Sequence, residues 1–226
     1  MISIGISGLE APEYESLHPL LKVSELDLPT YLSWSNKHKK QLQRCIREGH
    51  QLIGSFSSAW LFPSQESSHE TDEEKITILG ELQESLQIHA LIIRLQPRHL
   101  NQSLTNLQSL PIFADWPQGT RDYPMPEHPR NLNLVWDPCW DAGKPRPSMT
   151  GHPWIAKIHG WHPDRWVRRY GTEQIRECAQ TIRESLKTNS TLGYLLIAHS
   201  QRRQQWEEFK NACEAVCQDL GAFQSY

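Results

Sequence analysis

The chain has 226 residues, with 23 lysines and arginines against 26 aspartates and glutamates. A hydrophobic fraction of 38% is enough for a sizeable core and is not that of a disordered chain, and a net charge of -3 excludes a globally basic nucleic-acid-binding protein. No apolar run approaches the roughly 20 residues of a membrane span, so we expect no membrane partner. Five cysteines without paired spacing favour a reducing, cytoplasmic compartment.

Short apolar or β-branched runs alternate with helical patterns along the chain. This alternation is typical of repeated strand–helix units around a parallel sheet, and runs such as LIIRL and YLLIA suit strands that are buried on both faces. The sequence predicts seven strands, at Ile2–Ser7, Leu21–Leu26, Leu52–Phe56, Ala90–Leu95, Leu132–Trp136, Trp154–His159 and Tyr194–Ala198. We interpret residues 1–226 as a single α/β domain of the (β/α) TIM-barrel type, incomplete or distorted, with about seven strands.

The helical segments have clearer patterns than the strands. Residues 36–48 carry apolar residues on one face and are followed by Gly49, a typical C-terminal stop. The spacing of Thr71 and Glu74 predicts a capping box for the next helix. Apolar residues at helical spacing predict two further helices, over residues 172–186 and 206–220.

Two proline-rich regions interrupt the alternation of strand and helix patterns. Residues 111–130 have little periodicity, and we expect an ordered loop with little regular structure there. Residues 140–153 contain three prolines and two glycines, which oppose the helix that a parallel crossover needs. We therefore expect an irregular connection near residue 145, where one strand–helix unit is missing or rewritten.

Short motifs follow one another in a recognisable order: IGISG at the first strand, SELDLPTY at the second, RLQP at the fourth, WDPCW at the fifth, KIHG and RRYGTEQI around the sixth, and AHS at the last. In these motifs and their order the chain resembles the YecE-like family, domain of unknown function seventy-two. The resemblance implies a (β/α) barrel. It places Glu25 and Asp137 at acidic positions of the family pattern, Tyr31 at an aromatic one, His159 in a His-Gly pair and Tyr170 ahead of a helix. It implies no reaction, because the activity of the family is not established.

Polar residues at the C-terminal ends of parallel strands are expected to meet in one cleft. Glu25, Asp137 and His159 are our candidates for catalytic proton transfer, since two carboxylates in unequal environments can divide the acid and base roles. The alternative is that each carboxylate holds Arg94 or Lys157 in an internal ion-pair network. Lys157 and His159 share one strand face. If that face is interior, the two residues form a buried charged pair that needs partners.

The segment from Lys157 to Tyr170 has a local excess of positive charge among aromatic residues. Arginine forks bind phosphate or carboxylate, and aromatic faces stack on bases or sugars, so we expect an anionic, phosphorylated or nucleotide-like ligand. Arginine and tryptophan also cover hydrophobic surface in loops, and that alternative stays open. The expected ligand-binding residues are Tyr31, Arg94, Lys157, Trp161, His162, Arg165, Arg169, Tyr170 and His199.

The sequence identifies no cofactor, and we expect no metal site. His159 and His162 have HxxH spacing, but no clear third ligand accompanies them. The leading hypothesis is a barrel enzyme or enzyme-like protein that binds an anionic small molecule at the strand C-termini. One alternative is a module for single-stranded nucleic acid that uses Trp161, Trp166 and Tyr170 as stacking faces. The other is a catalytically silent relative that acts as an interaction protein.

Overall fold

A computed structural model describes residues 2–8, 21–61, 72–94, 111–115, 133–136, 154–158, 180 and 193–198. The chain groups into two compact units. The first contains Met1–Gly8, Ser16–Ser24 and Trp136–Tyr226, and the second contains Leu9–Glu15 and Glu25–Val135. Each unit is described by itself below.

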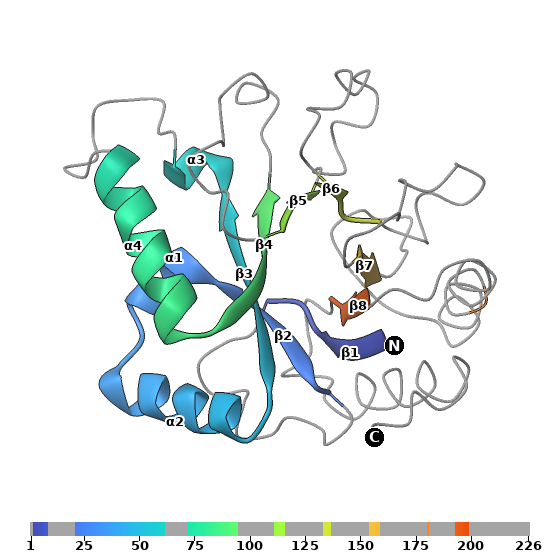
Figure 1. The fold of residues 1–226 in the computed structure, drawn as a ribbon, viewed down its shortest axis with the longest axis horizontal. Coiled ribbons are helices and arrows are strands. Elements are labelled where there is room, and N and C mark those ends of the chain that lie inside the picture. Colours follow the sequence, from blue (N-terminus) through green and yellow to red (C-terminus); the bar gives the residue numbers. More distant parts are fainter. Residues whose placement is uncertain are drawn as a thin grey trace, which may run out of the picture. The chain divides into compact units, whose positions relative to one another are not determined.

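The first unit contains strands from both ends of the chain: β1 (Ile2–Ile6), the start of β2 (Val23–Asp27), β7 (Trp154–Ile158) and β8 (Gly193–Ile197) (Figure 1). Strand β8 lies between β1 and β7, and all of these pairings are parallel. On its other side β1 pairs with Val23 and Ser24 of β2. Both β7 and β8 are buried along their whole length, as their continuous apolar runs predict.

The second unit contains β3 (Gln51–Ser57), β4 (Ile88–Arg94), β5 (Ile112–Asp115), β6 (Asn133–Leu134), α1 (Leu28–Leu32), α2 (Asn36–Arg47), α3 (Ser58–Leu61) and α4 (Asp72–Ser85). Strands β3, β4, β5 and β6 pair in that order, again in parallel. Helix α1 packs against β3, and α4 packs against β4 and α3. The strand order is β6-β5-β4-β3-β2 in the second unit and β2-β1-β8-β7 in the first, with β2 divided between them.

The seven predicted strands correspond to β1, β2, β3, β4, β6, β7 and β8, and the parallel α/β architecture is confirmed. The expectation of an irregular loop over residues 111–130 is wrong at its start, where Ile112–Asp115 forms β5. Four residues are too few to show a period, and their burial arises from pairing with β4 and β6. The irregular connection predicted over residues 140–153 lies outside the described residues.

Helix α2 confirms the predicted helix and its stop. The hydroxyl of Ser35 caps its first turn by accepting a hydrogen bond from the His38 N–H at 3.4 Å. Gly49 has a φ of 94°, in the left-handed region where glycine is favoured after a helix. Residue Thr71 and the helices predicted over 172–186 and 206–220 lie outside the described residues, except that Gln180 is helical.

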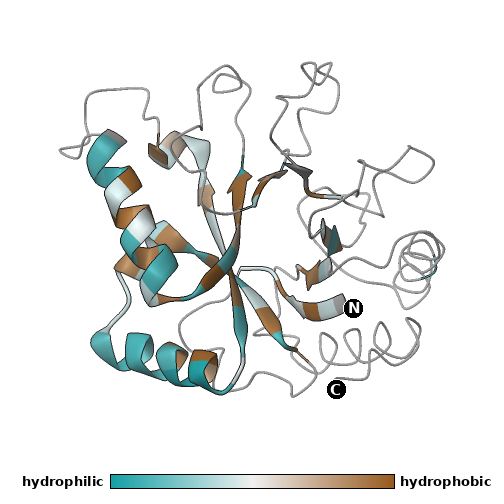
Figure 2. Ribbon diagram, in the orientation of Figure 1, coloured by the Kyte–Doolittle hydropathy of each residue, from teal (hydrophilic) through white to brown (hydrophobic). Residues whose placement is uncertain are grey.

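The hydropathy of the elements separates the core from the surface. Figure 2 shows strongly apolar segments on the strands, whereas α2 is hydrophilic over most of its length. Leu42 is the buried residue of α2 and fixes the helix to the core of the second unit. Among the helices that the structure describes, none is long and apolar enough to cross a membrane.

Candidate functional site

Asp27 is the last residue of β2 and directly precedes α1, and its side chain caps the N-terminus of that helix. Its Oδ1 atom accepts hydrogen bonds from the Thr30 N–H at 3.0 Å and from the Thr30 hydroxyl at 2.7 Å. Pro29 in the first turn suits a helix start, where its missing N–H has no role. The sequence DLPT therefore encodes a carboxylate fixed at the end of a strand. The site residues predicted from the sequence did not include Asp27, although this capping pattern was a signal for it.

Arg94, the last residue of β4, forms an ion pair with Asp27 through Nη2 and Oδ2. The Arg94 side chain is 43% exposed and that of Asp27 is 24% exposed. Strands β2 and β4 lie on either side of β3, so the pair passes over the end of β3. A pair this exposed contributes little net stability. Its main effect is to hold the guanidinium at the C-terminal edge of the sheet.

The strand register places three polar residues side by side at this edge. Ser57 of β3 is paired with Arg94, and Arg94 is paired with Asp115 of β5. Residues paired in this way project from the same face of a sheet. Gly54 lies three residues before Ser57 in β3 and therefore projects from the opposite face. A Cβ on Gly54 would lie 3.0 Å from Leu28 Cδ1 in α1, so α1 covers that opposite face. We call Asp27, Ser57, Arg94 and Asp115 the strand-end cluster.

Glu25 lies two residues before Asp27 in β2 and therefore projects from the same strand face. Its exposed fraction is 2%, and it has an interaction partner. The nearby Ser55 hydroxyl donates a hydrogen bond to the Leu26 carbonyl at 3.4 Å. The second unit thus holds one buried carboxylate next to a carboxylate that reaches solvent, and such unequal environments can give two carboxylates different roles.

We expect the Asp27 carboxylate to make stability depend on acidic pH. Burial raises its pKa, but the hydrogen bonds from Thr30 and the Arg94 guanidinium outweigh burial and hold the pKa below the ordinary 3.8. The folded state then binds fewer protons than the unfolded state, so this stability is present above about pH 4 and is lost as the pH falls toward the folded-state pKa. In urea unfolding at a series of pH values, Asp27→Asn should lose less stability on acidification than the wild type. Arg94→Met should show a smaller change in the same direction, because the Thr30 hydrogen bonds remain. Identical pH profiles for all three proteins would contradict this assignment.

Four predicted site residues lie in the described part of the chain: Glu25, Tyr31, Arg94 and Lys157. The ring of Tyr31 is buried on α1, with its centroid 5.5 Å from that of Trp34 and 5.3 Å from the Lys39 Nζ atom. Burial raises the pKa of its hydroxyl. These contacts give Tyr31 a packing role where α1 leads into α2, and its ligand-binding role stays a prediction.

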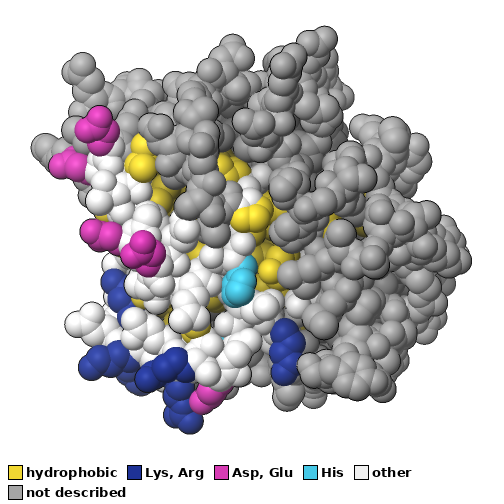
Figure 3. Space-filling model, viewed as in Figure 1, with side chains coloured by type: hydrophobic (Ala, Val, Ile, Leu, Met, Phe, Trp, Pro, Cys, Tyr) yellow, Lys and Arg dark blue, Asp and Glu magenta, His cyan; other side chains and the backbone are white. Residues whose placement is uncertain are grey.

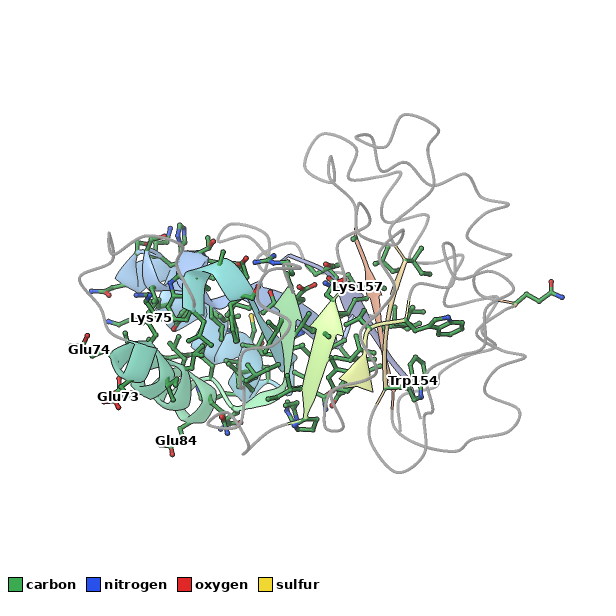
Figure 4. All side chains as sticks on the ribbon, turned by 90° about the horizontal axis from the view of Figure 1, so that it is seen from above. Glu73, Glu74, Lys75, Glu84, Trp154 and Lys157 are labelled. Carbon is green, nitrogen blue, oxygen red and sulfur yellow. The ribbon has the colours of Figure 1, made fainter. Side chains whose placement is uncertain are left out.

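Lys157 lies on β7 of the first unit and is 2% exposed (Figure 4). It pairs in register with Leu196, which in turn pairs with Gly5. Its neighbour Ala156 projects from the opposite face and forms a bridge with Trp136. Lys157 is therefore a buried charge of the kind that needs a partner, and it has one.

The other predicted site residues lie outside the described residues, and their roles stay predictions: Asp137, His159, Trp161, His162, Arg165, Arg169, Tyr170 and His199. The predicted convergence of Glu25 and Arg94 with Asp137 and His159 is open for the same reason. Within the described ranges, no group of three or more His, Cys, Asp or Glu residues is placed to hold a metal ion.

Sequence reasoning missed a second buried lysine, Lys75 on α4. It is 2% exposed and begins the buried face that continues through Leu79, Leu82 and Leu86. Its Nζ atom lies 6.0 Å from the centre of the Trp60 ring on α3, within reach of a cation–π contact. The labelled glutamates of α4 project away from this packed side (Figure 4). The signal was the position of Lys75, four residues before Leu79 on the apolar face.

Comparison with solved structures relates this architecture to known folds. The crystal structure of a DUF72 family protein from Enterococcus faecalis V583 has a TM-score of 0.62 and 13% identity, and covers 100% of this chain and 97% of that chain. The structure of D-psicose 3-epimerase in the presence of D-fructose has a TM-score of 0.61 and 11% identity, and covers 97% of this chain and 100% of that chain. A DUF72 family protein from Thermotoga maritima has a TM-score of 0.52 and 14% identity, and covers 95% of this chain and 97% of that chain. No protein-family model and no curated protein matches the sequence significantly.

The chain therefore has an α/β barrel-like fold, as the sequence predicts. It shares this fold with DUF72 family proteins, the family that its motifs resemble. A likeness at these identities defines the fold and leaves the chemistry to the residues of the chain itself.

Proposed function

We propose that this barrel protein is an enzyme or enzyme-like protein that binds an anionic, phosphorylated or nucleotide-like ligand at the C-terminal ends of its strands. The observation that carries the proposal is Arg94, whose partly exposed guanidinium is held at the end of β4 by Asp27. A guanidinium has five N–H donors in a planar fork that matches the oxygens of a phosphate. The ion pair with Asp27 uses Nη2, and the fork has further N–H groups for a ligand.

The carboxylates beside Arg94 favour a ligand that also carries hydroxyl groups. Asp27 and Asp115 accept hydrogen bonds from hydroxyls, whereas they repel a bare anion. A sugar phosphate or a nucleotide has both parts, with a phosphate for Arg94 and hydroxyls for the carboxylates and Ser57. The likeness of the fold to D-psicose 3-epimerase, whose structure was determined in the presence of D-fructose, supports the hydroxylated part of this ligand.

Glu25 is the described candidate for proton transfer in this proposal. It is buried and lies on the strand face from which Asp27 reaches Arg94, and a positioned carboxyl group contributes roughly 10²–10⁴-fold when it moves a proton in the transition state. Asp137 and His159 remain the partners that the sequence proposes for it. The alternatives, a stacking module for single-stranded nucleic acid and a silent interaction protein, depend on residues outside the described ranges and stay predictions.

The test is calorimetric titration with sugar phosphates, mononucleotides, the matching unphosphorylated sugars and orthophosphate. Arg94→Ala should weaken binding of the phosphorylated ligands by about tenfold or more, because a hydrogen bond to a charged group contributes ~1.5–3 kcal/mol and each decade corresponds to ~1.4 kcal/mol. Arg94→Lys should restore part of the affinity, since lysine keeps the charge but lacks the fork.

The control is Lys22→Ala, which removes an exposed cation that belongs to neither the strand-end cluster nor α2 and should leave ligand binding unchanged. Equal loss of affinity in both variants would show a general charge effect and no site at Arg94. If the wild type bound no phosphorylated compound of the panel, the proposed ligand class would be wrong.

A further inference from the structure

Helix α2 carries a stripe of positive charge on its solvent-facing side. Lys37, Lys40, Arg44 and Arg47 are all exposed and follow one another at intervals of three, four and three residues, the spacing of a single helix face. At ~1.5 Å per residue the stripe is about 15 Å long. Figure 3 shows Lys and Arg side chains gathered over α2. We call these four residues the α2 stripe.

The α2 stripe is positively charged although the whole chain is net negative, and α2 is held in place by its packing and its N-cap. Helix α2 contains no acidic residue, although the whole chain has a net charge of -3. Buried Leu42 and the Ser35 cap fix the helix in place. Glu48, just beyond the helix, pairs with Arg44 at 2.9 Å, but the two side chains are 61% and 76% exposed. A pair so exposed is weak and can be exchanged for another anion.

The chemistry of the stripe distinguishes between kinds of polyanionic partner. Protein interfaces are depleted in lysine and depend on buried aromatic and arginine anchors, and α2 has no aromatic residue. A helix that binds a membrane surface needs an apolar face in the lipid, whereas the buried residue of α2, Leu42, faces the protein core. A nucleic-acid backbone needs only cations at the spacing of its phosphates, because release of condensed counterions drives binding.

We propose that the α2 stripe binds the phosphate backbone of duplex nucleic acid without reading its sequence. A duplex carries one charge per roughly 3.4 Å of axis on each strand, so the stripe extends past several phosphates of one strand. In the absence of aromatic side chains on α2, the contacts are to phosphates and not to bases. This surface is independent of the strand-end cluster and of its proposed small ligand.

The experiment measures fluorescence anisotropy of labelled 20-base-pair DNA and RNA duplexes of mixed sequence over a range of salt concentrations. Four phosphate contacts predict that log K falls with log salt with a slope of about -3 to -4. The triple variant Lys37→Gln/Lys40→Gln/Arg47→Gln should reduce the slope to about -1 and weaken binding at low salt by about tenfold or more. Its melting temperature should stay close to that of the wild type, because all three side chains are exposed.

Two controls separate the stripe from other causes. Lys37→Arg/Lys40→Arg/Arg47→Lys keeps the charge and should keep the slope. Lys22→Gln removes an exposed lysine outside α2 and should not alter duplex binding.

Several results would overturn the proposal. Wild-type protein that binds neither duplex at about 50 mM salt, or a triple variant with the wild-type slope, would show that the stripe is only a solvated surface. Sedimentation that shows a salt-sensitive dimer, lost in the triple variant while duplexes do not bind, would assign the stripe to a second copy of the chain. Binding to phosphatidylserine vesicles without duplex binding would assign it to a membrane surface.

Discussion

Gly5→Ala should lower the free energy of unfolding by about 3 kcal/mol or more, although it adds only one methyl group. A Cβ at Gly5 would lie 1.9 Å from the Val23 carbonyl oxygen and 2.5 Å from Val23 Cγ1. This oxygen belongs to the backbone of the strand that pairs with β1, and Gly5 is in register with Val23. Because a paired backbone cannot rotate away as a side chain can, relief requires the two strands to separate, and overpacking of this kind falls at or above the usual range of ~1–3 kcal/mol.

Chemical denaturation and thermal unfolding measure this effect, and the melting temperature should fall by about 6–12 °C for a chain of this size. The matched control is Gly80→Ala in the middle of α4, where nothing lies within 4 Å of the added Cβ. That variant should be more stable than the wild type by ~0.5–1 kcal/mol, since alanine favours a helix over glycine. Equal stability of the two variants would contradict the close approach of β1 and β2.

The sequence predicted the strands whose burial is continuous and missed the one whose burial depends on its neighbours. Strand β8 is buried at every position, so an apolar run was enough to find it. In β5, Phe113 is 1% exposed, but the strand has only four residues and directly follows Pro111. Its burial comes from pairing with β4 and β6, and 17 residues separate it from each of them in the sequence (95–111 and 116–132). The hydropathy pattern within a four-residue segment carries no information about such pairing.

Contacts between segments far apart in the sequence also limited the prediction of the site. The sequence predicted the position of Arg94 at a strand end, because the apolar run of β4 ends there. It did not predict the ion-pair partner of Arg94. The sequence suggested that Glu25 or Asp137 would hold Arg94 or Lys157, and the structure pairs Arg94 with Asp27. That contact depends on β2 and β4 lying on either side of β3, which is a property of strand order and register and not of any one segment.

Lys157→Met should lower the free energy of unfolding by about 2–4 kcal/mol. Methionine nearly preserves the length and the apolar stem of lysine, so the main loss is the ammonium group. Lys157 is 2% exposed and has an interaction partner, and removing one side of a buried charged interaction leaves the other side without compensation. Lys157→Ala should lose about 1–2 kcal/mol more, because the stem packed beside Leu196 of β8 is then missing as well. Urea unfolding of both variants gives these differences.

Lys22→Met is the matched control in the same unit, since Lys22 is exposed and its replacement should change the free energy of unfolding by no more than ~0.5 kcal/mol. The comparison of methionine with alanine separates charge from packing: a loss confined to the alanine variant would mean that only the stem of Lys157 matters. A methionine variant more stable than the wild type would contradict the prediction more strongly. It would mean that burial of the ammonium group costs more than its interaction contributes, and unfavourable groups of that kind are typical of sites where stability is sacrificed for activity. The stability of the methionine variant therefore shows whether the buried ammonium group of Lys157 is a net gain or a net cost to folding.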